Sequence, residues 1–316
     1  MKKFFRLLAI SAIAISMFIS NCIGVLALED NSNRIDINRM RSMKNISTLG
    51  LHEQNILILS ESGIGDSIIN NMDDTRIDRM LENAWSIQTQ VVYLKTDAEG
   101  NTTEINEIEY NMDTVTNNTQ RSSNDKQQVM ESDDDYMRIT VTCVYLDPST
   151  QNGEKGWYMI YTWYEWLTAP SQRELDAFSI ASEEFDWSRA TSYYAAGYYT
   201  AYEANDRLVT FPLGSKTTTD LTKNGNGYFY TWDIPNADGL DMNYVQFYTH
   251  VKCRTYNYDT YHEINVFAKY IHHISSISTH NYVWTDSKSS MGVDIKGALI
   301  RSIYFLELNH SYDPAE

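Results

Sequence analysis

The sequence predicts a mainly β protein: an antiparallel β-sandwich or jelly roll, preceded by a small N-terminal segment of helices and one hairpin. From Tyr136 onward, apolar and polar residues alternate in segment after segment, which is the pattern of half-buried strands. Turn-forming residues separate these segments, as at 224–227. Of 23 tyrosines, only Tyr93 and Tyr110 precede Tyr136, so the aromatic residues concentrate where the strands are predicted. Many short strands separated by turns favour a sandwich.

The first 27 residues have the pattern of an export signal. Three basic residues precede an apolar run at 7–23, and small residues then allow cleavage after Ala27. Two alternatives remain open, an N-terminal membrane anchor and a lipid attached to Cys22. No later stretch is apolar enough to span a bilayer. We therefore expect a secreted, extracellular protein that makes no membrane contact after its signal peptide is removed.

The chain is strongly acidic. Its formal net charge is −17, and loss of the leader would remove three basic residues and no acidic one. Proteins bind nucleic acid and anionic membranes mainly through Lys and Arg, so this charge argues against both partners. A solvated acidic surface, or an extracellular glycan or protein ligand, is compatible with it.

Composition divides the chain into four parts. The signal peptide occupies 1–27 and a small helical and hairpin region 28–112. Residues 113–135 are polar, and we expect a flexible linker because such a stretch cannot offset its ordering entropy. Residues 136–316 form the aromatic-rich sandwich.

The N-terminal region contains two readable patterns. Helical spacing relates seven apolar residues: Ile68, Ile69, Met72, Ile77, Met80, Leu81 and Trp85. Asp66 and Asp73 are candidate N-caps, so the run should divide into two short helices. Alternation on either side of a turn at 97–101 then predicts a β-hairpin.

Three short motifs of this region resemble those of a family. They are a helical start at Gly65–Ile69, a strand at Val91–Tyr93 and a turn at Asp97–Asn101. Together they resemble leader-proximal segments of uncharacterised secreted proteins of Gram-positive bacteria. The resemblance covers under a fifth of the chain and implies no activity.

The segment 157–167 is apolar on both faces when it is written as a strand. Trp163 belongs to one face, which we interpret as core. The other face carries three residues that are candidates for a ligand-binding rim: Tyr158, Tyr164 and Trp166. Aromatic rings stack on sugars and dominate protein-binding hot spots, whereas a large exposed apolar patch is unusual without a purpose. Burial on both sides is the alternative, with residues 171–182 as the cover.

Two cysteines, Cys143 and Cys253, follow the leader. An even count in an extracellular protein favours a disulfide between them. Because both residues fall on apolar strand faces, two unpaired core thiols are the alternative.

Catalytic patterns are weak. Glu184 and Asp186 would share a strand face, as paired carboxylates of a glycosidase require, but no general acid follows them. A glycan-active hydrolase would draw on a set of five carboxylates: Glu165, Asp176, Glu183, Glu184 and Asp186.

Metal and cofactor patterns are also weak. The histidines lack the spacing of a zinc site, and no phosphate-binding or nucleotide-binding loop occurs. The acidic segment 233–243 lacks EF-hand spacing, yet a Ca²⁺-stabilised loop there is a further hypothesis. We otherwise expect neither metal nor cofactor.

The sequence therefore favours a secreted, non-catalytic binding protein with an extracellular ligand, either a carbohydrate or another component of a cell envelope. The alternative is the secreted hydrolase that uses carboxylates near 183–186. A structural part of a surface or spore layer is a third hypothesis.

Overall fold

The computed structural model describes residues 34–97, 101–109, 135–166, 175–202, 207–217, 222–224, 227–233, 241–273, 281–283, 292–294 and 300–314. Contacts divide the chain into two units, Met1–Ser32 and Asn33–Glu316, and every described residue belongs to the second. The expected signal peptide, the lipidation alternative at Cys22 and nearly all of the expected linker therefore lie outside the described residues. None of the helices in the described ranges is long and apolar enough to cross a membrane.

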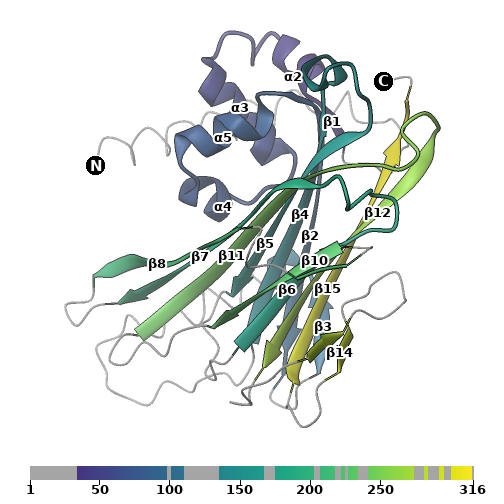
Figure 1. Ribbon diagram of the computed structural model, residues 1–316. Coiled ribbons are helices and arrows are strands. Elements are labelled where there is room, and N and C mark those ends of the chain that lie inside the picture. Colours follow the sequence, from purple (N-terminus) through teal and green to yellow (C-terminus); the bar gives the residue numbers. More distant parts are fainter. Residues whose placement is uncertain are drawn as a thin grey trace. The chain divides into compact units, whose positions relative to one another are not determined.

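Two antiparallel sheets form the body of this unit, which confirms the predicted mainly β, sandwich-like fold (Figure 1). Sheet A has the order β1 (Arg34–Asp36), β2 (Ala84–Thr96), β4 (Asp135–Leu146), β5 (Trp157–Trp166), β11 (Asp241–Arg254), β7 (Thr191–Tyr202) and β8 (Leu208–Lys216), with β3 (Thr102–Ile105) paired to β2. Sheet B has the order β15 (Ile300–Tyr312), β12 (His262–His273), β6 (Leu175–Ala181), β10 (Gly227–Asp233) and β9 (Thr222–Asn224). A separate pair consists of β13 (Asn281–Val283) and β14 (Gly292–Asp294).

Four short helices pack on sheet A. They are α2 (Ile37–Ser42), α3 (Leu51–Glu61), α4 (Asp66–Asn71) and α5 (Asp74–Leu81). The predicted break between α4 and α5 is present, and the Asp73 side chain caps α5 by accepting a hydrogen bond from the Arg76 amide. Asp66 is instead the first residue of α4, and Gly65 precedes it as the N-cap. Trp85 lies on β2 and not in a helix.

The expected hairpin forms between β2 and β3. Its strands pair from Tyr93 with Ile105 to Thr96 with Thr102. Asp97 accepts a hydrogen bond from the Asn101 amide at 2.7 Å, which holds the two ends of the turn together.

The helical region is not separate from the sandwich in this structure. Strand β2 lies between β1 and β4 in sheet A, and its pairing with β4 runs from Ala84–Leu146 to Thr96–Asp135. The expected division at 113–135 thus differs from the contact-based one, which places Asn33–Glu316 in a single unit. Alternation within β2 does not reveal its partner, because pairing between distant strands leaves no local signal.

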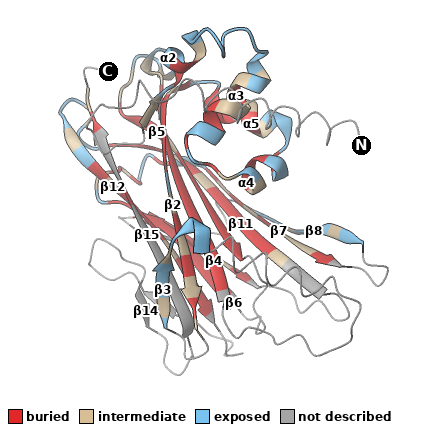
Figure 2. Cartoon of the chain, turned by 180° about the vertical axis from the view of Figure 1, so that it is seen from behind, coloured by how far each residue is buried: buried red, intermediate tan, exposed pale blue. Residues whose placement is uncertain are grey.

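Strand β5 is buried on both faces (Figure 2). Its inner face meets sheet B: Tyr164 lies 5.3 Å from Phe178 of β6 between ring centroids. Its outer face, turned away from sheet B, includes Trp163 and belongs to the same apolar cluster as the helices. Residues 175–181, expected as part of a cover, are strand β6 of the opposite sheet.

The two cysteines are free and buried, which corrects the expected disulfide. Cys143 of β4 lies opposite Ile160, and Cys253 of β11 lies opposite Tyr158. Both partners belong to β5, so this strand separates the thiols. Two interstrand spacings amount to about 10 Å, and a disulfide tolerates a Cα separation of only about 7 Å. Sequence alternation correctly places both cysteines inside but does not show the strand between them.

Candidate functional site

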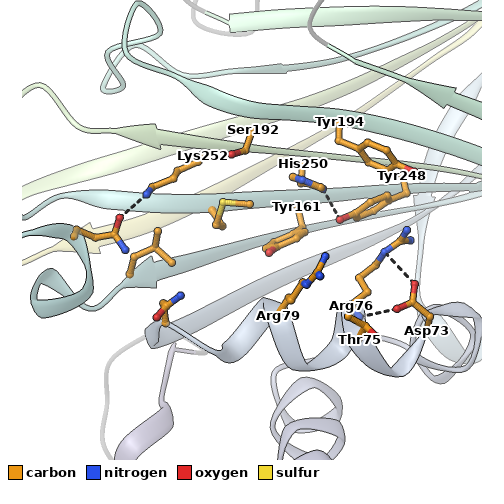
Figure 3. Close-up of a pocket in the computed structure, with 14 residues that line it drawn as sticks. Asp73, Thr75, Arg76, Arg79, Tyr161, Ser192, Tyr194, Tyr248, His250 and Lys252 are labelled. Carbon is orange, nitrogen blue, oxygen red and sulfur yellow. Dashed lines mark hydrogen bonds and ion pairs between the residues drawn. The ribbon is translucent and has the colours of Figure 1, made fainter.

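A pocket of about 570 Å³ lies where α5 meets the outer face of sheet A (Figure 3). Its walls come from α5, β5, β7, β11 and the short 3-10 helix η2 (Pro148–Gln151). This volume falls in the range of small-molecule sites, which are concave and combine apolar walls with a few convergent polar groups. We call it the tyrosine pocket, defined by Tyr161, Tyr194, Tyr248 and His250.

Strand register sets the rings of the pocket in a row. His250 of β11 lies directly opposite Tyr161 of β5 on one side and Tyr194 of β7 on the other. The ring centroids of His250 are 5.5 Å from Tyr161 and 5.4 Å from Tyr194. Tyr248 lies two residues before His250 on β11, on the same face of the sheet, and its ring centroid is 6.3 Å from that of Tyr161. Tyr194 and His250 are partly exposed, whereas Tyr161 and Tyr248 form a nearly buried floor.

The backbone around this row is irregular. The register between β11 and β7 shifts between His250 and Lys252, and such a bulge re-aims the side chains of a strand. Ser192, at the start of β7, has a φ of 56°, a left-handed conformation that is uncommon outside glycine. Strained residues of this kind gather at functional sites. Both irregularities occur at the pocket wall.

Cationic side chains surround the rings. The Arg76 guanidinium lies 4.8 Å from the centre of the Tyr248 ring, and Arg79 projects from the next turn of α5 (Figure 3). Lys252 lies 4.8 Å from the Trp157 ring and donates a hydrogen bond to Gln151. Asp73 is the carboxylate of the pocket lining, and its Oδ2 lies 4.0 Å from Arg76 Nε.

Burial controls the protonation of the pocket. It lowers the pKa of His250 to about 4, and the Arg76 charge acts in the same direction, so the imidazole is neutral at neutral pH. Burial also raises the pKa of Tyr248 well above its ordinary value, which keeps the phenol protonated. The pKa of Lys252 is lowered by burial, against the opposing charge of Glu154.

A second polar cluster lies under α4. Glu165, on the outer face of β5, is fully buried and pairs with Arg138 of β4 at 2.5 Å. Ser67, Tyr244 and Gln246 complete its hydrogen bonds. A Cβ at Gly65, the residue before α4, would come within 2.8 Å of the guanidinium, so a side chain there would displace Arg138. Fully satisfied, this cluster joins the helices to sheet A.

A third polar pair lies between the sheets. Asp176 of β6 and His272 of β12 are fully buried, with Oδ1 and Nδ1 2.6 Å apart. The Trp166 ring packs 5.0 Å from the imidazole. This pair lies on the inner side of sheet A, whereas Glu165 lies on the outer side. The sequence-predicted carboxylates Glu165 and Asp176 are therefore not brought together.

The remaining predicted carboxylates occupy a turn after β6. Glu183 is exposed, Glu184 accepts a hydrogen bond from Ser182, and Asp186 accepts one from the Ser188 amide. The turn is fixed to the sandwich through a bridge of Phe185 to Thr255. Strand β6, which spans roughly 20 Å, separates these residues from Asp176 at its other end.

The structure places the three predicted rim residues inside the sandwich. Tyr158, Tyr164 and Trp166 each have 0% of their surface exposed. Tyr164 donates to the Ser179 carbonyl at 2.8 Å, and the Trp166 indole donates to Tyr270 at 2.9 Å, so their polar atoms are satisfied internally. This corrects the expected rim, because an external ligand has no access to these rings. Sheet B supplies the cover, and its strand β6 lies within the segment 171–182 that the sequence offered as one.

Metal-binding hypotheses gain little from the structure. Within the described ranges, no three His, Cys, Asp or Glu side chains are grouped to hold an ion. Most of the expected Ca²⁺ loop, residues 234–240, lies outside these ranges.

Comparisons with known proteins leave the family open. No family model and no curated protein matches the sequence. Among solved structures, Clostridium perfringens delta-toxin is 6% identical with a TM-score of 0.24, over 73% of this chain and 91% of the toxin. The collagen-binding domain of Erysipelothrix rhusiopathiae surface protein RspB is 10% identical with a TM-score of 0.23, over 56% and 67%.

A third structure, described as concerning pH-induced modulation of Streptococcus parasanguinis adhesion by Fap1 fimbriae, is 12% identical with a TM-score of 0.21, over 54% of this chain and 78% of the other. At such TM-scores these likenesses carry no functional argument. The function has to be inferred from the residues of the site.

Proposed function

We propose that this chain is a secreted, non-catalytic binding protein that holds a carbohydrate in the tyrosine pocket. The row of rings formed by Tyr161, His250 and Tyr194 supports this most directly. Flat aromatic side chains stack against the apolar faces of sugar rings, and tyrosine hydroxyls can hydrogen-bond to the polar groups at the edges of the sugar. Strand pairing fixes the row in advance, so little side-chain freedom is lost on binding.

Binding fits the pocket better than hydrolysis. A paired-carboxylate glycosidase needs an acid and a second carboxylate about 5–10 Å away. Asp73 is the single carboxylate in the described lining, and it already caps α5 and pairs with Arg76. No observation on the described residues favours the hydrolase alternative, so we retain the binding function.

A glycan screen with matched variants tests the proposal. Tyr194→Ala removes the most accessible tyrosine of the row, and we expect it to weaken glycan binding about tenfold or more. Tyr199→Ala is the control: this ring lies on the same strand, is also partly exposed, and stacks on Phe211 instead of lining the pocket. Equal binding by both variants, or no glycan bound by the wild-type chain, would contradict the proposal.

Secretion is tested separately. We expect exported material to begin at residue 28, as read by N-terminal sequencing, because the leader pattern ends at Ala27. Material that retains the leader, or that carries a lipid on Cys22, would show that the chain is anchored.

A further inference from the structure

We propose that the tyrosine pocket selects acidic carbohydrates, with the carboxylate of a uronic acid as the recognised group. This inference rests on the proposed carbohydrate-binding function and names its ligand class. It comes from the side chains that surround the ring row.

The pocket is cationic in an anionic chain. Arg76, Arg79 and Lys252 line it, against the single carboxylate of Asp73, whereas the whole sequence has a net charge of −17. Since the chain has 42 acidic and 25 basic residues, three cations around one small cavity run against its composition. Such a local excess attracts anions even when the overall charge repels them.

These cations are only partly neutralised. Arg79 has no carboxylate partner within the described part of the chain, and its side chain is exposed at the pocket wall. Lys252 is bound to the neutral amide of Gln151. The Glu154 charge acts on Lys252 by raising its pKa. Glu154 is itself paired with two arginines, at 3.4 Å from Arg189 and 3.3 Å from Arg254.

The remaining groups add no compensating negative charge. His250 is neutral because burial lowers its pKa, and the Tyr248 phenol is protonated because burial raises its own. Burial raises the pKa of Tyr161 as well, so its phenol is also protonated. A carboxylate that enters the pocket therefore meets cations and hydrogen-bond donors.

The cations lie on two sides of the rings. Arg76 and Arg79 are three residues apart on α5 and so share one face of the helix, while Lys252 extends from β11 beyond His250 (Figure 3). A sugar stacked on the row would have its apolar face on the rings and its edge toward α5. An arginine there offers a planar pair of donors that matches a carboxylate.

Carboxylated oligosaccharides and their methyl esters test the selectivity. Tetrasaccharides of galacturonate, glucuronate-containing hyaluronan and mannuronate are titrated by calorimetry, each beside the form in which methyl esters cap the carboxylates. Esterification removes the charge and keeps the sugar ring. We expect at least one acid to bind about tenfold tighter than its ester, because a hydrogen bond to a charged group is lost with the ester.

Charge variants locate the effect. Arg79→Gln and Lys252→Gln should each abolish most of this preference, and each should weaken binding of the acid far more than binding of its ester. Arg39→Gln and Lys44→Gln are the controls, since both remove one positive charge from exposed positions outside the pocket. A loss of preference in the controls as well would assign it to long-range charge and overturn the inference.

The outcomes separate the two proposals. Acid preference that depends on Arg79 and Lys252 supports the inference. Equal binding of acids and esters, sensitive to Tyr194→Ala, overturns the acidic selectivity but keeps the carbohydrate function. Equal binding of a sulfated tetrasaccharide or an oligonucleotide shows general anion capture and also overturns it. Binding of no saccharide at all removes both proposals.

Discussion

The two faces of sheet A bury aromatic side chains in different ways. On the inner face, Tyr158 and Trp166 contact another sheet and are fully buried. On the outer face, Trp163 is covered by helices that are at most 11 residues long, whereas Tyr194, farther along the sheet, stays partly exposed. The opposing sheet buries the rings of the central strands fully, while short helices leave space between their ends and the strands. The pocket occupies such a space.

The largest expected effect concerns Trp166. Because it is buried between the sheets, Trp166→Ala should lower the free energy of unfolding by about 3–5 kcal/mol. Trp163→Ala, on the outer face, should cost a similar amount since its ring is 1% exposed. Chemical denaturation measures both, with Tyr261→Ala as an exposed control that should change stability by less than about 0.5 kcal/mol. If Trp166→Ala leaves the free energy of unfolding unchanged, the Trp166 ring is not buried between the sheets.

A somewhat smaller effect is expected for Glu165→Gln. The substitution leaves the Arg138 guanidinium next to a neutral amide in a nearly dry environment, which should cost about 3 kcal/mol. Replacing both residues by methionine should recover much of this loss, because no unpaired charge remains. If the single substitution is neutral in denaturation, α4 does not seal this part of the outer face.

The pocket face should also respond to pH through His250. Its pKa is near 4 in the folded protein and about 6.5 when unfolded, so the unfolded chain binds the extra proton first. Stability should therefore fall as pH drops from about 6.5 to 4, by roughly 2–3 kcal/mol, and change little further from this group below about pH 3. Denaturation midpoints measured over this range should lose that slope in His250→Gln. An identical slope in the variant would mean that other groups cause it.

The smallest effect is expected at Ser192. Its left-handed backbone suits glycine, so Ser192→Gly should stabilise the protein by up to about 1 kcal/mol. Asn152 has a similar φ of 58°, but asparagine tolerates this conformation, and Asn152→Gly should be nearly neutral. Thermal melting distinguishes the two. Destabilisation by Ser192→Gly would show that the hydroxyl matters more than the backbone at this pocket wall.

Much of the fold was accessible from local pattern. The alternation of apolar and polar residues after Tyr136 correctly predicts long strands such as β11 and β12. The capping residue Asp73 correctly predicts where α5 begins. These features depend on neighbours in sequence, so the sequence alone specifies them.

The order of strands was not accessible in the same way. Nothing near Cys143 or Cys253 shows that β5 lies between them, and nothing near Trp166 shows that β12 also covers it. Such relations depend on pairings between strands that lie far apart in the sequence, as β5 and β11 do. The pocket was missed for this reason: Tyr194 and His250 become neighbours only through the pairing of β7 with β11.

The separation of the two thiols has a consequence for how the chain must mature. In the folded protein, burial raises the pKa of both Cys143 and Cys253, so neither forms a reactive thiolate. In the unfolded chain both regain ordinary acidity and can be joined by an oxidant. A bridge made then would draw together residues that the finished sheet holds about two strands apart. In an oxidising compartment, β5 must therefore pair with β4 and β11 before the two thiols are oxidised. Early formation of sheet A prevents a disulfide that would block the native fold.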